Sequence, residues 1–151
     1  MPPLLHLADA DAYRAHYEAT LCRGGIVTHD GIPVLFRKTD FDHAFFESSD
    51  RRGSKDVFSL DRAERLDWIA PALAAQQAQR FQGWNSRYQR HEPARRVTVV
   101  IDNFVIVIGL RLDRQNALKA QFMTCYKADN SIGKIVQAPA WNLQDCLNAL
   151  R

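Results

Sequence analysis

Three strand-like runs near the middle of the 151-residue chain, the first two of them β-branched, constrain its fold more than any other feature. Residues 95–102, "RRVTVVID", and residues 104–112, "FVIVIGLRL", meet at Asp102-Asn103, which is a signal for a tight hairpin. The second run is apolar on both faces, so it predicts a central strand that is covered on both sides. A third strand is expected over residues 118–127. The three runs together predict an antiparallel meander.

Helical patterns precede this meander. Tyr13, Tyr17 and Leu21 recur every four residues, as on one face of a helix within residues 8–22. A short helix is expected near Asp40. The segment "LDRAERLDWIAPALAAQQAQRF", residues 60–81, predicts a longer helix with Ser59 as its N-cap and a kink at Pro71.

The remaining segments complete the expected architecture. Two short β-type runs flank the turn signal at residues 29–31, and residues 82–96 are expected to form a loop. The C-terminal "WNLQDCLNALR" predicts a closing helix with Asn142 as its cap. The expected fold is α+β, in one domain over residues 1–151, with the N-terminal helices packed on one face of the antiparallel meander.

Composition narrows the class of protein. The chain is 46% hydrophobic and 25% charged, which is typical of globular proteins. With 20 Lys+Arg against 17 Asp+Glu, the net charge of +3 permits a nucleic-acid partner without requiring one. The 3 cysteines lack a disulfide or zinc-binding spacing, no cofactor motif is present, and no apolar run reaches the roughly 20 residues that span a membrane. We therefore expect a cytoplasmic protein with no metal, no cofactor and no membrane contact.

Two groups in the N-terminal half could carry chemistry. His43 and Glu47 would be an i,i+4 pair if residues 41–48 were helical, and a carboxylate orients an imidazole for acid–base catalysis. The alternative is a histidine that braces the helix. Arg62 and Arg65 share a helix face, and their guanidinium groups match phosphate oxygens; the alternative is a solvated face paired with neighbouring carboxylates.

The most nucleic-acid-like stretch is "RFQGWNSRYQRHEPARR", residues 80–96. Basic side chains follow a phosphate backbone, and aromatic faces stack on unpaired bases. Trp84, Arg87 and Arg90 are therefore candidates for RNA binding. The alternative is an exposed crossover whose Trp84 fills part of the core.

The third expected strand carries two hydroxyl side chains, Thr124 and Tyr126, two positions apart and therefore on the same face. Strict alternation would put Ala120, Phe122, Thr124 and Tyr126 on one face, with Thr124 and Tyr126 about 7 Å apart. That separation suits two groups that hold one phosphate. It suits equally well two hydroxyls at the rim of a core.

Several segments, taken in order, resemble the phage-associated branch of the barnase–EndoU–colicin–RelE (BECR) nuclease superfamily. The resemblance covers about residues 26–141, and its most specific piece is Thr124-Cys125-Tyr126 after two apolar strands. The segments that carry it are "FDHAFFESS", "KDVFSLDRAERLDWI", "RRVTVVIDNFVIVI", "AQFMTCYKAD" and "KIVQAPAW".

This resemblance implies metal-independent cleavage of RNA, in which the 2′-OH of the RNA attacks the adjacent phosphate. It also implies that the helices come before the antiparallel sheet in the chain and that the catalytic groups lie on one face of that sheet. By this resemblance His43 would be the general acid or base, with His29 as a second candidate. Lys55 and Arg65 would bind the scissile phosphate and neutralise its developing charge. Thr124 and Tyr126 would hydrogen-bond the phosphate, or Tyr126 would help with proton transfer.

Two classes of function remain open from the sequence. The first is a toxin-like endoribonuclease that acts on RNA such as tRNA and has a cognate inhibitor protein. The second is a non-catalytic RNA- or protein-binding module of phage or mobile-element origin on the same fold. A DNA-binding module has no recognition-helix signature to support it.

Overall fold

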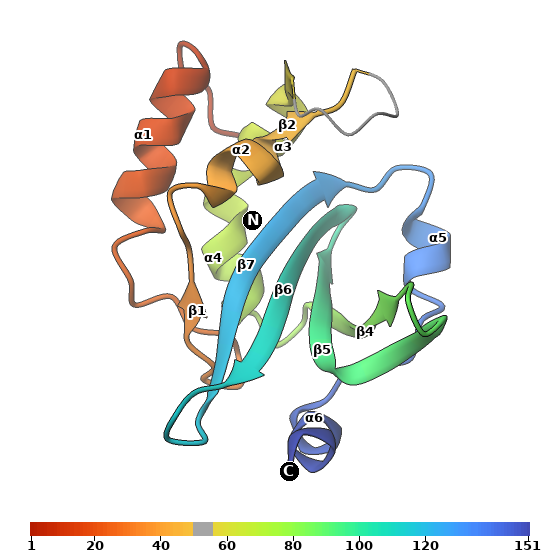
Figure 1. The fold of residues 1–151 in the computed structure, drawn as a ribbon. Helices are drawn as coiled ribbons and strands as arrows, with labels where there is room; N and C mark the ends of the chain where they lie inside the picture. Colours follow the sequence, from red (N-terminus) through yellow and green to blue (C-terminus); the bar gives the residue numbers. More distant parts are fainter. Residues whose placement is uncertain (50–55) are drawn as a thin grey trace.

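The structure is a computed structural model that describes residues 1–49 and 56–151. Its strands are short in the N-terminal half and long in the meander (Figure 1). In chain order the helices and strands are α1 (Ala10–Thr20), β1 (Val34–Leu35), α2 (Asp40–Phe45), β2 (Phe46–Glu47), β3 (Val57–Phe58), α3 (Leu60–Ala63), the 3-10 helix η1 (Leu66–Trp68), α4 (Ile69–Ala74), β4 (Gln79–Asn85), β5 (Arg90–Ile101), β6 (Phe104–Leu112), β7 (Leu118–Lys127), α5 (Ile132–Ile135) and α6 (Leu143–Leu150).

Five strands form the main sheet in the order β1-β7-β6-β5-β4. Strands β4 to β7 are antiparallel, and β1 pairs with β7 in parallel. The hairpin at Asp102 and the strand over residues 118–127 are as predicted, and Asp102 has the positive φ of 52° that the tight turn requires. The prediction of an α+β chain with a mostly antiparallel sheet is confirmed.

The two faces of the sheet bury different clusters. On one face, here called the helical face, the cross-strand row Val99–Ile106–Cys125 belongs to a core that also contains residues of the N-terminal helices, such as Tyr17 and Phe45. On the other, here called the second face, Val100 and Val105 form a smaller cluster with residues of α5. The central strand β6 is thus covered on both sides, as its apolar sequence predicts.

A β-bulge in β7 overturns the predicted alternation of that strand. Phe122 pairs with Ile108 and Thr124 pairs with Val107, so Met123 has no partner in β6. One extra residue exchanges the faces beyond it. Phe122 and Cys125 therefore both lie in the main core, while Tyr126 packs on the second face.

Residues 82–96 form most of a hairpin, and the prediction of a loop there is wrong. Strands β4 and β5 pair from Asn85–Arg90 to Gln79–Val100. Between the pairs Gln82–Val97 and Gly83–Glu92, four residues of β5 have no partner in β4. This interruption contains Pro93 and disrupts the two-residue periodicity by which strands are recognised. The turn is closed by the Asn85 side chain, which accepts a hydrogen bond from the Arg87 backbone N–H at 3.0 Å.

The interrupted hairpin depends on a glycine. A Cβ atom on Gly83 would lie 2.5 Å from the Cβ of Arg96, a distance that forces the strands apart. We expect Gly83→Ala to lower the free energy of unfolding by about 1–3 kcal/mol, measured by urea denaturation. Gly133→Ala is the matched control, because its Cβ meets nothing within 4 Å. Equal stability of the two variants would contradict this account of the close approach.

The helices differ from prediction in their lengths and caps. The expected helix over residues 60–81 is divided into α3, η1 and α4, and it ends at Ala74. Ser59 stands at the N-cap of α3 without a side-chain cap hydrogen bond. Asn142 caps α6 as predicted, since its side chain accepts from the Asp145 N–H at 2.9 Å. In the described ranges, no helix has the length and apolarity needed to cross a membrane.

Candidate functional site

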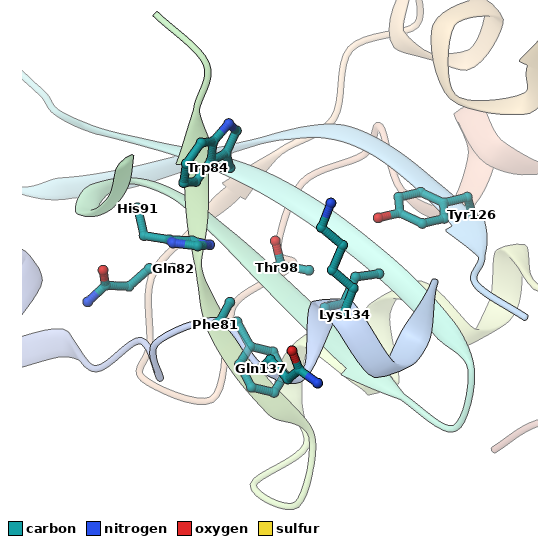
Figure 2. Close-up of a pocket in the computed structure, with 10 residues that line it drawn as sticks. Phe81, Gln82, Trp84, His91, Thr98, Tyr126, Lys134 and Gln137 are labelled. Carbon is teal, nitrogen blue, oxygen red and sulfur yellow. The ribbon is translucent and has the colours of Figure 1, made fainter. Parts of the chain in front are cut away.

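A pocket of about 660 Å³ lies over the second face, between β4, β5, β7 and the segment that carries α5 (Figure 2). It combines an apolar floor with polar groups from distant parts of the chain. Its lining residues are Phe81, Gln82, Trp84, His91, Thr98, Tyr126, Lys134, Ile135, Gln137 and Ala138.

The strand register explains why these residues meet. Phe81 pairs with Thr98, Thr98 with Val107, and Val107 with Thr124, so the four form one row across the sheet. Thr124 thus lies in the same row as two pocket residues. Tyr126 is two positions further along β7, beside Val105.

Helix α5 closes one side of the pocket. Ile132 and Ile135 lie three positions apart, hence on one helix face, and both pack against the small cluster that contains Phe81 and Val105. Lys134 is on the same helix and is exposed, and its ammonium group extends over the pocket (Figure 2). The apolar contacts of α5 therefore hold the backbone of Lys134 beside the pocket.

Three groups in the pocket can exchange or donate protons: the His91 imidazole, the Tyr126 phenol and the Lys134 ammonium. Burial raises the pKa of Tyr126, and the positive charge of Arg62 opposes this rise. The phenol therefore stays protonated at neutral pH and can donate a hydrogen bond. Figure 2 shows its oxygen turned toward the interior of the pocket.

The tip of the β4–β5 hairpin carries aromatic and basic side chains beside the pocket. Trp84 and Tyr88 are 47% and 57% exposed, so Trp84 does not fill the core. The guanidinium carbons of Arg87 and Arg90 lie 5.5 and 5.3 Å from the centre of the Tyr88 ring, within the range of cation–π contacts. Arg90 also pairs with Glu92 at 3.1 Å. The tip thus presents exposed rings and cations together.

Among the predicted catalytic residues that the structure describes, Tyr126 alone lines the pocket, and Thr124 lies in the row that contains Phe81 and Thr98. His43 is exposed on α2, whose buried residues belong to the main core on the helical face. The expected His43–Glu47 helical pair does not form, because α2 ends at Phe45 and Glu47 instead bonds Arg62 at 3.2 Å. Lys55 lies outside the described residues.

The other predicted cations have structural contacts. Arg62, predicted to bind RNA, has a side chain only 15% exposed; it donates to the Ala44 carbonyl at 3.0 Å in addition to pairing with Glu47. Arg65 donates to the Asp61 carbonyl at 2.6 Å, and its guanidinium lies 5.2 Å from the centre of the Trp68 ring. Arg62 therefore links α3 to α2 and β2, whereas the contacts of Arg65 stay within the α3–η1 region. His29 is exposed in the turn before β1.

The sequence analysis missed His91, Thr98 and Lys134 as site residues. His91 lies within the segment already marked as rich in arginine and aromatic residues, and its cross-strand pairing with Trp84 could have been found only by recognising the hairpin. Thr98 is on the second face because its neighbours Val97 and Val99 point to the main core. Neither a strand pattern nor a basic and aromatic segment in the sequence marks Lys134 as a site residue.

Comparison with protein-family models, curated proteins and solved structures finds no match to this chain. The arrangement of side chains in the pocket therefore carries the functional argument.

Proposed function

We propose that this chain is a metal-independent endoribonuclease whose active site is the pocket on the second face. The observation that carries the proposal is the meeting of His91, Tyr126 and Lys134 in one pocket beside the exposed Trp84. The order of N-terminal helices followed by an antiparallel meander supports the resemblance to the BECR nucleases, which places catalysis on a sheet face.

The proposed chemistry requires few groups, because RNA contains its own nucleophile. One group removes the proton from the 2′-OH, the oxygen attacks the adjacent phosphate, and a second group gives a proton to the departing 5′ oxygen. The products are a 2′,3′-cyclic phosphate and a 5′-OH. His91 is the acid–base candidate, since an imidazole ring can both accept and donate a proton. Lys134 stabilises the charge on the phosphorane, and the protonated phenol of Tyr126 is the candidate for the group that gives a proton to the 5′ oxygen.

The first test is cleavage of bulk tRNA and of an unstructured RNA in excess EDTA. We expect both RNAs to yield fragments that end in a 2′,3′-cyclic phosphate, because no step uses a metal ion. End-group analysis by mass spectrometry identifies these products. Fragments that appear only when Mg²⁺ is added, or that carry a 5′-phosphate, would contradict the proposed mechanism.

A second candidate function is a non-catalytic RNA-binding module on the same fold. The exposed Trp84, Tyr88, Arg87 and Arg90 at the hairpin tip favour it, since rings and cations suffice to hold a single strand. Such a module would bind the same RNAs in EDTA and leave them intact. A toxin-like role for the enzyme, with a cognate inhibitor, requires in addition that expression of the chain arrests growth.

A further inference from the structure

We propose that the pocket binds one unpaired base of a single-stranded RNA segment, with Trp84 as the stacking surface and Lys134 beside the neighbouring phosphate. Loops and ends of RNA, rather than its helical segments, are then the substrate. This inference rests on the proposed function, because it requires RNA in the pocket.

Trp84 differs from the other two tryptophans in what holds it. The indole N–H of Trp68 donates to the Pro2 carbonyl at 2.7 Å, and that of Trp141 donates to the Pro93 carbonyl at 2.8 Å. Both therefore connect distant segments of the fold. Across residues 1–49 and 56–151, no equivalent hydrogen bond is found for Trp84, whose side chain is 47% exposed. The structural role that accounts for Trp68 and Trp141 therefore does not account for Trp84.

The neighbour of Trp84 orients the ring without covering it fully. His91 meets it at 5.0 Å between centroids and at an angle of 70°, an edge-to-face contact. In the described part of the chain no second aromatic ring packs on Trp84. The indole is therefore held in place while a large part of its surface stays open to a planar ligand, and stacking is the contact that every base can make.

The pocket beside Trp84 has the size and charge for a nucleotide. Its volume of about 660 Å³ falls within the range of roughly 300–1,000 Å³ that is typical of small-molecule sites. Figure 2 shows Lys134 and Tyr126 across the pocket from Trp84 and His91, so a stacked base leaves its sugar and phosphate near a cation.

A base inside an RNA helix cannot make these contacts. Its two faces are covered by neighbouring bases, its pairing edge is bonded to the opposite strand, and the deep major groove excludes side chains. An unpaired base can leave the stack and place its face on the indole. The geometry therefore selects unpaired positions.

The experiment compares two non-cleavable RNAs of equal length and charge, both 2′-O-methylated: one hairpin with an open loop and one fully paired duplex. Fluorescence anisotropy at one fixed salt concentration, in EDTA, gives both dissociation constants. We expect the loop RNA to bind at least about 10-fold more tightly, and Trp84→Ala to weaken its binding about 5- to 150-fold. Binding of the duplex should change less than about 2-fold, since it involves only the phosphates.

Two further variants show whether stacking is responsible. Trp84→Phe keeps a flat ring and should retain most of the affinity for the loop RNA. Leu35→Ala is the matched control: Leu35 is 50% exposed and lies on β1, at the opposite edge of the sheet from β4. It should leave both affinities unchanged.

Several results would overturn the inference. The first is equal affinity for the loop RNA and the duplex. The second is an equal loss of affinity for both RNAs in Trp84→Ala. The third is that a nucleoside monophosphate competes for the pocket as effectively as the loop RNA itself. The last would make a free nucleotide the ligand. If the protein prefers the loop RNA but never cuts RNA, the proposed nuclease activity is rejected and the inference about unpaired bases is kept. If the protein cuts loops and duplexes at equal rates, the nuclease activity is kept and the inference about unpaired bases is rejected. Failure to bind either RNA would reject both.

Discussion

Replacing His91 with alanine is expected to lower the rate of RNA cleavage about 10²- to 10⁴-fold, the usual contribution of one positioned acid or base. His91 lies in the pocket and meets Trp84 edge-to-face, so it is held against β4 while its nitrogens remain available. Initial rates of cleavage of one fluorescent RNA, measured from pH 5 to pH 9, test this. The variant should be slower by this factor at the pH at which the unmodified chain is fastest.

Two further variants separate proton transfer from structural support. His43→Ala is the matched control, because His43 is exposed on α2 and does not line the pocket. We expect its rate to be close to that of the unmodified chain. His91→Phe keeps an aromatic ring against Trp84 and should be as inactive as His91→Ala. Recovery of activity in His91→Phe, or a large loss in His43→Ala, would contradict the assignment of His91.

The largest expected effect on stability comes from Phe122→Ala. Phe122 is 0% exposed, stacks on Phe36 at 5.0 Å and lies near Tyr17 at 6.4 Å. Its truncation should lower the free energy of unfolding by about 3–5 kcal/mol, because the transfer free energy of the ring is lost and a cavity remains. That is a large part of the roughly 5–15 kcal/mol that stabilises a typical domain.

Urea denaturation followed by circular dichroism measures this loss. Tyr88→Ala is the matched control, since it also removes an aromatic ring, but one that is 57% exposed at the hairpin tip. Its stability should stay within about 0.5 kcal/mol of the unmodified chain. Similar losses in the two variants would show that Phe122 is not a central contact of the main core.

The sequence predicted those parts of the fold whose signals are local. The runs on either side of Asp102 are long, apolar and separated by a recognised turn, and the structure contains both strands. Asn142 is likewise a local cap signal, and its hydrogen bond is present. The β4–β5 hairpin was missed because four residues of β5, Pro93 among them, have no partner in β4 and interrupt the pattern, although the pairing on both sides of the interruption is regular.

The composition of the candidate site depends more on which strands pair, and in which register, than on the local spacing of residues in the sequence. Trp84 was identified from the aromatic and basic residues of its segment, and Tyr126 from its place on a predicted strand and the resemblance to the BECR nucleases; both line the pocket. His91 and Lys134 were not, because their proximity depends on the strand register and on the return of α5 to the second face. His43 was selected from its spacing to Glu47, but the helix that would join them ends too early for that contact.

Met123 has no partner in β6, so β7 could lose this residue without any change in the faces to which its other side chains point. Without this residue, Phe122 and Cys125 would be two positions apart, and they would still face the N-terminal helices, with Thr124 and Tyr126 still opposite them. At any other position in the strand, loss of one residue would turn part of the strand inside out. The strand therefore contains one point at which evolution could add or remove a residue and keep both the core and the pocket wall intact.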